Sequence, residues 1–593
     1  MNEIKKIIKS SIDEVKEYGL RTYLSHVIEK IKNREFYIVD EFSSGKEFSK
    51  INEPSDDYER WITKNEPSIE QMIEEYKQIK LTKNPLISIV MSVYDPPLSI
   101  FQETINSVIT QIYENWELCI SNGSENEEIT NELEKISRED KRIKVKHVIN
   151  KGISANTNIA LELSNGEFVA LLDHDDTLSP NALFEIAKVV DKDESIDFIY
   201  SDADKITEFG KRYQPFFKPD WSPEILYSSN YVAHLCVFRK KVMDQIERFS
   251  SKKDGAQDWD MILRTIEISR KIHHIPKVLY HWRTLRNSTA SSRSAKPFAL
   301  NSQLMAVNRH LQEKNIQAYV IHGPGNYLKC NFYMQIPKIS IIIPIIKIEK
   351  HLESYLMNKT KSDSKSDYEI ILVVKKELKF DLKNKEYFIK NNVTWHKKQF
   401  EYISDALNFG ASLAQGKLLL FLNLALEPNS PKWLEEMAGW CTIDKIGCVS
   451  CKITDIKGII KHGGVTIDKE GYCHYVFNGL RDRSAVWTIF GAQEWYRNFN
   501  AVTGDCLMIR KELFLSNNGF ENRDGFDIDF CLKLREKGYR MVYTPHSKLI
   551  IHGKLKNLKK IDVNNYRNIK LGDSYMSPHL EYHDVRKIKM GEN

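Results

Sequence analysis

The sequence predicts an α/β protein built from two similar domains in tandem, preceded by a helical segment. Three observations support this prediction. The chain has 593 residues, strand-like apolar runs alternate with helical patterns, and the same order of elements returns after residue 337. Strands that alternate with helices form parallel sheets covered on both faces. We therefore expect one such domain in residues 85–320 and a second in residues 338–555.

Residues 1–84 are rich in Lys, Glu and Ile and form the predicted helical segment. Apolar residues recur at helical spacing near the start, with lysines beside them, which predicts an amphipathic helix: Ile4, Ile7, Ile8, Ile12 and Val15. Its apolar stripe packs either on the body of the protein or on the anionic inner surface of a membrane, and the sequence leaves both open.

The first domain opens with a strand-like run at 86–94, a helical pattern at 99–113 and a second strand-like run at 116–121. A charged helical stretch and a third strand-like run at 143–149 follow. This order is typical of a parallel sheet with crossover helices.

The second domain repeats that order. Strand-like runs occupy 337–346, 367–374 and 393–398. Residues 400–423 (FEYISDALNFGASLAQGKLLLFLN) then match 150–173 (NKGISANTNIALELSNGEFVALLD) in length and pattern. A repeat of this size predicts two similar folds joined near residues 320–337.

The composition is that of a globular protein without a nucleic-acid partner. Charged residues make up 28% of the chain, apolar residues 41%, and the net charge is only +5. No run approaches the ~20 apolar residues of a membrane span, and the first residues do not read as a signal peptide. We therefore expect a cytoplasmic protein.

Nine cysteines without regular spacing fit reduced thiols. Cys448 and Cys451 form a CxxC within a strand-like run, where residues three apart point to opposite faces, so we expect no metal or redox role for them.

An acidic cluster follows the strand-like run FVALL of the first domain. Asp173, Asp175 and Asp176 repel one another unless a cation lies among them, and a hard divalent ion such as Mg²⁺ or Mn²⁺ would also bind a diphosphate. The alternative is an acidic turn that caps the next helix. The second domain has Asn423, Ala425 and Leu426 at these positions, so we expect a metal in the first domain only.

These motifs resemble the nucleotide-binding half of inverting family 2 glycosyltransferases, which have the Rossmann-like GT-A fold of nucleotide-diphospho-sugar transferases. The resemblance rests on Val93 to Asp95, on Gly152 to Asn158 (GxSxxxN) and on Asp173 with Asp175 (DxD). It continues through YSDADK, FKPDWSPEIL, NYVAHLCVFRK, GAQDWDMILR and LYHWR, and so covers about 85–290.

The resemblance implies a role for each matching residue. It makes Asp258 of GAQDWD the general base that takes the proton of the acceptor hydroxyl. It implies the following sets: metal ligands Asp173, Asp175 and His281; donor-binding residues Val93, Tyr94, Asp95, Asn122, Asn156, Asp173 and Asp204; acceptor-binding residues Trp221, His234 and Trp259.

Structural alternatives remain for three of these residues. Asp258 also reads as the N-cap of a helix, His281 as a buried and hydrogen-bonded imidazole, and Trp221 as a core residue.

The base pocket departs from the family pattern. The second strand of such enzymes usually ends in two acidic residues, whereas this one ends Ser121, Asn122, Gly123, Ser124. An Asn carbonyl can accept the N3 hydrogen of a pyrimidine, so the donor nucleotide stays open.

The second copy resembles the second glycosyltransferase domain of some polysaccharide-assembly enzymes over about 338–553. Its base-pocket strand ends Val374, Lys375, Lys376, and only Asp527, Asp529 and His552 remain of the acidic and histidine positions. We expect it to be silent toward nucleotide sugars, while it keeps a groove for glycan or a scaffolding surface, with 556–593 as a C-terminal tail.

Together these features predict a metal-dependent inverting glycosyltransferase. It would move a sugar from a nucleotide-sugar donor to a growing surface glycan (O-antigen, capsule or cell-wall polysaccharide), free or lipid-linked, at the cytoplasmic face of the membrane. The alternative is a non-catalytic glycan-binding or scaffold protein of a polysaccharide synthase complex. A nucleotidyltransferase is disfavoured, because no Gly- and Lys-rich loop follows the first strand.

Overall fold

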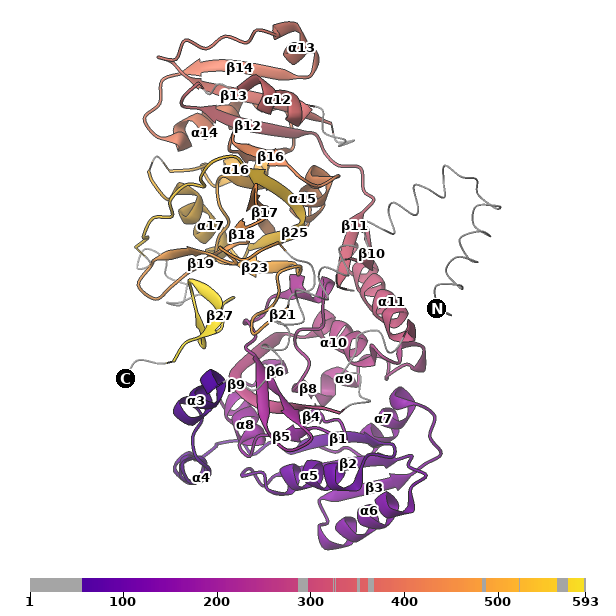
Figure 1. Ribbon diagram of the computed structural model, residues 1–593. Helices are drawn as coiled ribbons and strands as arrows, with labels where there is room; N and C mark the ends of the chain where they lie inside the picture. Colours follow the sequence, from indigo (N-terminus) through magenta and orange to yellow (C-terminus); the bar gives the residue numbers. More distant parts are fainter. Residues whose placement is uncertain are drawn as a thin grey trace, which may run out of the picture.

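The computed structural model describes most of the chain and shows two α/β bodies stacked end to end (Figure 1). The described residues are 56–285, 297–348 without 324 and 326, 352–360, 367–482, 487–562 without 522, and 574–590. The amphipathic helix expected near residues 4–15 lies outside them. Within the predicted N-terminal segment, the structure has helices α3 (Asp56–Asn65) and α4 (Ile69–Gln78).

The first sheet has the strand order β3-β2-β1-β4-β8-β6-β9-β5, and β7 (Arg212–Phe216) pairs with β6. The strands on this path are β1 (Ile87–Val93), β2 (Trp116–Asn122), β3 (Ile143–His147), β4 (Phe168–Leu171), β5 (Thr177–Leu178), β6 (Ile196–Thr207), β8 (Cys236–Arg239) and β9 (Lys271–Thr284).

The sheet is mixed, not fully parallel as predicted. Strands β1 to β4 are parallel, but β8 runs antiparallel to both β4 and β6. The reason is the connection before β8, which is a long loop and not a crossover helix. A parallel strand needs a crossover that returns the chain to the edge where the parallel strands begin, so without one β8 pairs in the antiparallel direction.

Helices follow the first and second strands of the sheet, as the periodicity predicts, and others occur later in the domain. They are α5 (Leu98–Ile109), α6 (Glu127–Glu139), α7 (Ile153–Glu162), α8 (Ala182–Lys192), α9 (Lys240–Met243), α10 (Gln257–Ile268) and α11 (Pro297–Glu313). A short hairpin, β10 (Ala318–His322) and β11 (Leu328–Phe332), then leads to the second body.

The second sheet has the matching order β14-β13-β12-β15-β24-β17-β25-β16, which confirms that the fold is repeated. The strands on this path are β12 (Ile339–Ile345), β13 (Tyr368–Lys375), β14 (Val393–Lys398), β15 (Leu418–Leu422), β16 (Leu426–Pro428), β17 (Ile446–Asp455), β24 (Cys506–Arg510) and β25 (Arg540–Ile551). Off the path, β18 (Ile460–His462) pairs with β17, and β23 (Arg497–Phe499) pairs with β25. Its helices are α12 (Leu352–Thr360), α13 (Lys385–Lys390), α14 (Ile403–Leu413), α15 (Trp433–Cys441), α16 (Lys511–Ser516) and α17 (Phe526–Glu536).

The repeat extends to single hydrogen bonds. In the first domain the Ser88 hydroxyl donates to Glu117 Oε1 (2.6 Å) and accepts the N–H of Gly166 (2.8 Å). In the second, Ser340 donates to Glu369 Oε1 (2.7 Å) and accepts the N–H of Gly416 (2.8 Å). The glycine turn before the central strand is therefore built in the same way in both copies.

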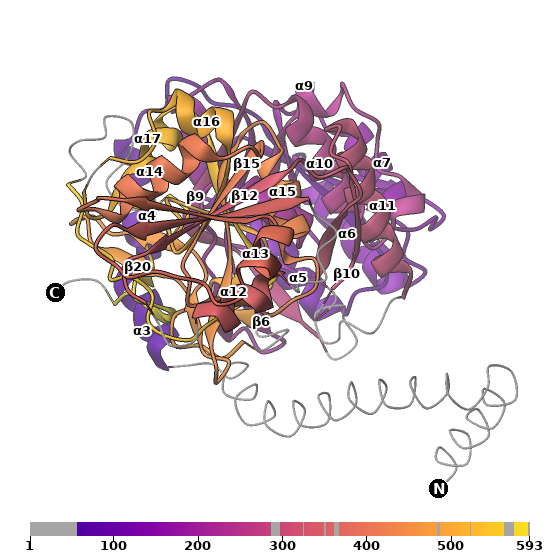
Figure 2. The same cartoon turned by 90° about the horizontal axis from the view of Figure 1, so that it is seen from above.

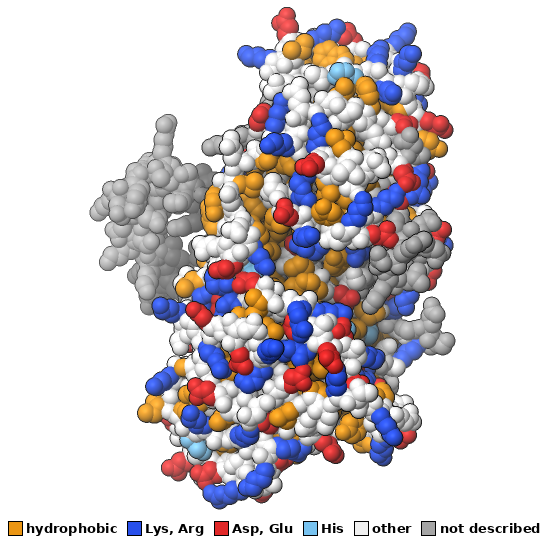
Figure 3. All heavy atoms as spheres, turned by 180° about the vertical axis from the view of Figure 1, so that it is seen from behind, with side chains coloured by type: hydrophobic (Ala, Val, Ile, Leu, Met, Phe, Trp, Pro, Cys, Tyr) orange, Lys and Arg blue, Asp and Glu red, His pale blue; other side chains and the backbone are white. Residues whose placement is uncertain are grey.

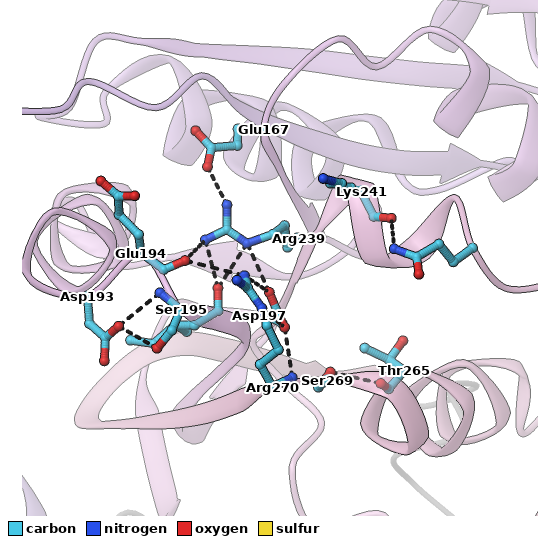
Figure 4. Close-up of polar contacts among 12 residues, drawn as sticks. Glu167, Asp193, Glu194, Ser195, Asp197, Arg239, Lys241, Thr265, Ser269 and Arg270 are labelled. Carbon is cyan, nitrogen blue, oxygen red and sulfur yellow. Dashed lines mark hydrogen bonds and ion pairs between the residues drawn. The ribbon is translucent and has the colours of Figure 1, made fainter.

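A charged cluster fastens the first sheet at its amino-terminal edge (Figure 4). The carboxylate of Asp197, at the start of β6, accepts hydrogen bonds from Arg239 at the end of β8 (3.1 Å) and from Arg270 just before β9 (2.7 and 3.0 Å). Burial alone would raise the pKa of Asp197, but the hydrogen bonds and charges of the two arginines lower it. This edge lies at the opposite end of β6 from the polar residues described below, so the cluster is structural.

The two bodies share one hydrophobic core. A single cluster of buried residues contains Phe198 and Tyr227 of the first body together with Trp440 and Tyr496 of the second. A separate cluster joins Trp61 of α3 to Phe217 of the first body, and to Met576 and Leu580 near the C-terminus. In both Figure 1 and Figure 2 the C-terminal hairpin accordingly lies beside α3.

The structure places the cysteines of the CxxC motif and limits the length of the apolar helices. None of the nine cysteines forms a disulfide, and Cys448 and Cys451 pack into different core clusters, on opposite faces of β17. No helix in the described part of the chain is long and apolar enough to span a membrane. Acidic and basic side chains are interspersed over the face shown in Figure 3.

Candidate functional site

The acidic loop 173–176 lies at the carboxyl end of β4, as predicted. Its last member, Asp176, is fully buried and accepts hydrogen bonds from the Tyr280 hydroxyl (2.5 Å) and the Arg283 backbone N–H (2.7 Å). Burial raises the pKa of Asp176, and the charges of Asp173 and Asp175 raise it further. Asp176 therefore anchors the loop to β9 and is not available to a ligand.

Asp173 and Asp175 stay more open than Asp176. Asp173 is exposed and Asp175 is half-buried. Arg283 Nε donates to the backbone carbonyl of Asp175 (2.8 Å), which fixes the loop without consuming the carboxylate. Burial raises the pKa of Asp175, and the charge of Asp173 adds to this. Two carboxylates thus crowd the sheet edge where ligands bind in open α/β folds.

His281 lies beside this loop because β9 pairs with both β5 and β6. It is opposite Thr177 in one ladder and beside Asp204 in the other. Its Nδ1 is 2.6 Å from Asp204 Oδ1, which leaves Nε2 for another partner. An imidazole held by a carboxylate in this way is typical of metal-binding histidines, so the buried, hydrogen-bonded reading and the ligand reading of His281 are compatible.

Asp204 itself lies behind His281. It is 2% exposed, and its Oδ2 accepts from Tyr58 Oη and from Arg212 Nε (2.6 Å each). Burial would raise the pKa of Asp204, but His281 and Arg212 lower it. The donor-binding role implied for Asp204 is therefore replaced by an orienting contact to His281.

The residues present fit a divalent metal held jointly with a substrate. Among the described residues, no group of three or more His, Cys, Asp or Glu side chains is arranged as a complete metal site. Mg²⁺ and similar ions are often held by only one or two carboxylates plus the phosphates of the substrate, and an oriented imidazole beside Asp173 and Asp175 suits this mode.

The predicted base pocket lies at the ends of β1 and β2. Val93 is paired with Asn122 in the sheet and is fully buried, whereas the ring of Tyr94 is 46% exposed. Asp95 Oδ1 accepts the backbone N–H groups of Glu125 and Asn126 (3.0 Å each), so it shapes the loop after β2.

The two asparagines assigned to donor binding have partners within the protein. Asn122 is 2% exposed, its Oδ1 accepts from the Ser124 N–H (3.0 Å), and its Nδ2 donates to Thr130 Oγ1 (3.1 Å). Asn156 is also 2% exposed, and its Nδ2 donates to Asn150 Oδ1 (2.9 Å). Both hold the walls of the pocket in place, and neither has a side chain open to solvent.

Asp258 is the second residue of α10, which begins at Gln257. The N-cap position belongs to Ala256, so the alternative that Asp258 caps this helix is wrong. Asn230 Nδ2 donates to Asp258 Oδ2 (2.9 Å). Burial raises the pKa of Asp258, and the negative charge of Asp173 raises it further.

These interactions join the predicted base, acceptor and metal residues into one site. His234 stacks on Tyr280 (ring centroids 4.8 Å apart), and burial lowers the pKa of His234 to about 4, so the ring is neutral near pH 7. The negative charges of Asp258 and Asp175 oppose this shift and raise the pKa of His234. Residues from β4, the loop before β8 and α10 therefore converge, although they are far apart in the sequence.

The two acceptor tryptophans are placed differently. Trp259 is 4% exposed and belongs to the core. Trp221 is half-buried and packs its inner side on the same cluster, which leaves part of the ring for a ligand.

Sequence reasoning assigned no role to three residues that build the site. Tyr280 and Arg283 fix the acidic loop, and Asn230 supports Asp258. All three lie within the motifs LYHWR and NYVAHL, so the signal was present, but motif positions alone do not show which side chains meet.

In the second domain, side chains of the protein itself fill the corresponding site. Asp527 is the second residue of α17, as Asp258 is of α10, but its carboxylate forms an ion pair with Lys556 Nζ. The Lys556 N–H donates to Asp505 Oδ2 (2.9 Å), and its carbonyl accepts from the Tyr475 hydroxyl (3.1 Å). Asn423, in the place of Asp173, donates to Asp505 Oδ1 (2.8 Å).

The interpretation of His552 as the surviving histidine is wrong. If Asp173–Asp176 align with 423–426, then Thr177, which faces His281, corresponds to Glu427. Glu427 faces Ile550, so Ile550 has the position of His281. His552 lies two residues further and contacts Glu427 Oε2 through Nε2 (2.6 Å).

Comparison with known proteins agrees with this geometry. The family described as "Glycosyl transferase family 2" matches residues 88–247. The uncharacterized protein y4gI of Sinorhizobium fredii is 34% identical over 495 residues, which is 80% of this chain and 54% of that protein. The O-antigen biosynthesis protein RfbC of Myxococcus xanthus is 31% identical over 509 residues, 84% of this chain and 39% of that protein.

A more distant relative, chondroitin synthase of Pasteurella multocida, is 25% identical over 236 residues, 40% of this chain and 24% of that protein. The chain thus spans about half the length, or less, of these curated relatives. Matches over 80% and 84% of the chain must include parts of both sheets, so the tandem pair as a whole has relatives.

Proposed function

We propose that this chain, whose first α/β domain belongs to glycosyl transferase family 2, transfers a sugar from a nucleotide-sugar donor to a surface glycan with inversion at the anomeric carbon. The observation that carries the proposal is the convergence of Asp258, the loop of Asp173 and Asp175, and His281 at one edge of the first sheet.

The acceptor hydroxyl loses its proton to Asp258 as its oxygen attacks the anomeric carbon. The C–O bond to the diphosphate breaks as the new glycosidic bond forms, so the configuration inverts in one displacement and no covalent enzyme intermediate arises. Asn230 orients the Asp258 carboxylate. His234, which stacks on Tyr280, is neutral near pH 7 and so adds no charge next to Asp258.

Asp173 and Asp175 would hold a divalent Mn²⁺ or Mg²⁺ together with the phosphates of the donor, with His281 as the further candidate ligand. When bound, such an ion neutralises the charge of the leaving diphosphate. Tyr280, Arg283 and Asp204 keep these side chains in position.

The acceptor is proposed to be a growing surface polysaccharide, free or lipid-linked. The relative named as an O-antigen biosynthesis protein supports this class. The same proposal places the chain in the cytoplasm, in contact with the inner membrane surface when the acceptor is lipid-linked. The second domain serves the reaction without turning over a nucleotide sugar, because Lys556 occupies the carboxylate that corresponds to Asp258.

The proposal is tested by screening UDP-, dTDP- and GDP-sugars for Mn²⁺-dependent hydrolysis or transfer. Asp258→Asn and Asp175→Ala should each lower kcat by on the order of 10²-fold or more with the fold intact, because they remove the base and a metal ligand. Asp527→Asn is the matched control, at the same helix position in the second copy. Parent-like turnover by Asp258→Asn, or equal losses in the control, would contradict the site assignment.

A further inference from the structure

The loop between β7 and β8, residues 217–235, carries the acceptor side of the site and is here named the acceptor loop. It contains Trp221, the short 3₁₀ helix η1 (Pro223–Tyr227), Asn230 and His234. Through Asn230 it also supports Asp258. The position of this loop therefore determines both where an acceptor lies and how the base is oriented.

Hydrogen bonds within the first domain join the two ends of the loop. Lys218 Nζ donates to the carbonyls of Val232 (3.1 Å) and His234 (2.6 Å), which joins the two ends of the loop. The Lys218 N–H donates to Asp202 Oδ1 (2.8 Å), and the Tyr200 hydroxyl donates to the Pro219 carbonyl (2.8 Å). Further along the loop, the Ser222 N–H donates to the Tyr231 hydroxyl (2.9 Å), and Tyr227 packs beside His310 of α11 (ring centroids 5.7 Å apart).

The middle of the loop is bound by the second domain. The Ser222 hydroxyl lies 2.9 Å from Asn498 Oδ1 and accepts the Asn498 backbone N–H (3.3 Å). Glu224 pairs with Arg540 through both guanidinium Nε and Nη2, with a shortest distance of 2.7 Å.

Backbone and apolar contacts extend this binding along the loop. The Phe217 N–H donates to the Ile489 carbonyl (3.0 Å), the Asp220 N–H to the Ser574 carbonyl (2.8 Å), and the Tyr496 N–H to the Ser228 hydroxyl (3.1 Å). Four separate parts of the chain after residue 480 therefore hold one loop of the first domain.

These contacts are buried, which makes them specific. Ser222 and Asn498 are each 1% exposed, and Glu224 is 2% exposed. A buried carboxylate or hydroxyl that lost its partner would keep its full desolvation cost, so the loop has one favoured position while the second domain is present. Beside η1, Tyr227 packs edge-on against Trp440 of α15 (ring centroids 5.4 Å apart).

We propose that the second α/β domain is a positioning device for the acceptor loop, and that Arg540 and Asn498 are positioning residues of the transfer reaction. This inference rests on the function proposed above. The second domain has its own cleft filled by Lys556 and contributes instead the surface against which the acceptor side of the first domain is set. This positioning role accounts for the finding that y4gI and RfbC each match parts of both domains of the chain.

The test compares Arg540→Gln and Asn498→Ala with Arg510→Gln. Arg510 donates to four backbone carbonyls within the second domain and does not touch the acceptor loop, so its variant controls for damage to that domain. Two readouts are taken on the full chain. One is hydrogen–deuterium exchange of the amides of 217–232; the other is kcat and KM for hydrolysis of UDP-GlcNAc, UDP-glucose, dTDP-rhamnose and GDP-mannose with Mn²⁺.

Arg540→Gln and Asn498→Ala should speed exchange in 217–232 and lower kcat by about 10- to 100-fold, while donor KM stays at the parent value, because a misplaced loop misorients the base but leaves the donor pocket intact. Parent-like kcat in both variants, or an equal loss in Arg510→Gln, would overturn the proposal. If the parent hydrolysed none of the donors, the proposed function would fail, and exchange alone would decide: unchanged protection of 217–232 in both variants would refute the positioning role.

Discussion

At the scale of single residues, two aspartates in the same helix position have opposite partners. Asp258 receives a hydrogen bond from the neutral amide of Asn230, whereas Asp527 is bound by the ammonium of Lys556. A carboxylate with a neutral partner can still take up a proton from a substrate. The Asp527 carboxylate is already occupied by the Lys556 ammonium, so the side-chain partner distinguishes a candidate base from a structural residue.

The pH dependence of the reaction should report on Asp258. Burial raises its pKa, so the base becomes protonated, and turnover falls, at a pH above the ~3.9 of an ordinary Asp. Asn230→Ala should move this acid limb of kcat to still higher pH, because the hydrogen bond that favours the carboxylate is lost. The measurement is a pH–rate profile of Mn²⁺-dependent donor hydrolysis, and an unmoved acid limb in Asn230→Ala would contradict the assignment.

Asp197 has a pKa shifted in the opposite direction from that of Asp258, and this shift makes the stability of the fold depend on pH. Its pKa is lowered in the folded state, so its contribution is present above the ~3.9 of the unfolded chain and is lost as pH falls through the folded value. Asp197→Asn should lower the free energy of unfolding by about 2–4 kcal/mol near pH 7, since it leaves Arg239 and Arg270 without their carboxylate.

Denaturant unfolding at neutral and acidic pH checks this expectation. The difference between Asp197→Asn and the parent should shrink as pH falls below the ~3.9 of the unfolded chain, where the carboxylate of the unfolded parent takes up a proton. A difference that stays constant with pH would show that the cluster in Figure 4 stabilises the fold by packing and not by charge.

At the scale of elements, the glycine turn before the central strand fixes how each sheet is assembled. A Cβ on Gly166 would lie 2.5 Å from Ser88 Oγ and 2.6 Å from the Leu86 carbonyl; one on Gly416 would lie 2.6 Å from the Lys338 carbonyl. These are backbone and strand atoms that cannot move aside, so only glycine fits at either position.

Gly166→Ala and Gly416→Ala should each lower the free energy of unfolding by about 1–3 kcal/mol, because the new methyl group overpacks the turn. Gly553→Ala, whose Cβ would meet only Ala425 Cβ at 4.0 Å, is the control and should behave like the parent. Thermal or denaturant unfolding measures the effect, and a neutral result in both turn variants would show that the turn relaxes freely.

At the scale of the whole molecule, the ends of the chain tie the two bodies together. The hairpin β26 (Leu580–Glu581) and β27 (Asp584–Ile588) packs with α3 and with Phe217 of the acceptor loop. His579 Nε2 also lies 2.8 Å from the carbonyl of Pro276, a residue of β9 in the first sheet. Residues expected to form a tail therefore act as a brace across the domain boundary.

Leu580→Ala should accordingly destabilise the molecule by about 2–5 kcal/mol, because Leu580 is fully buried in that cluster. Leu515→Ala, at a leucine that is 49% exposed, should change stability by less than about 0.5 kcal/mol. Both are read from denaturant unfolding. We expect a single transition in the parent, because the shared core couples the domains, and two separated transitions would contradict that coupling.

Much of the fold could be predicted from the sequence, and less of the site. Alternating apolar runs located the parallel strands, and the match of 400–423 to 150–173 predicted the repeat that the strand order confirms. The antiparallel β8 was missed because its direction is set by the connection before it, and not by its own residues. The motifs identified Asp173, Asp175, His281 and Asp258 as candidate site residues, but the partners that define their chemistry come from other elements.

By itself, the sequence determined that this chain is a repeated α/β fold with an acidic loop at one sheet edge, because hydrophobic periodicity and motif spacing are local properties. Only the tertiary structure decided which carboxylates are open, which are buried and which are paired. Asp176, Asp204 and Asp527 have the same chemical group as Asp175 and Asp258, yet Tyr280, His281 and Lys556 occupy them. Burial and partners set a carboxylate's proton affinity, and both depend on contacts between residues distant in the chain.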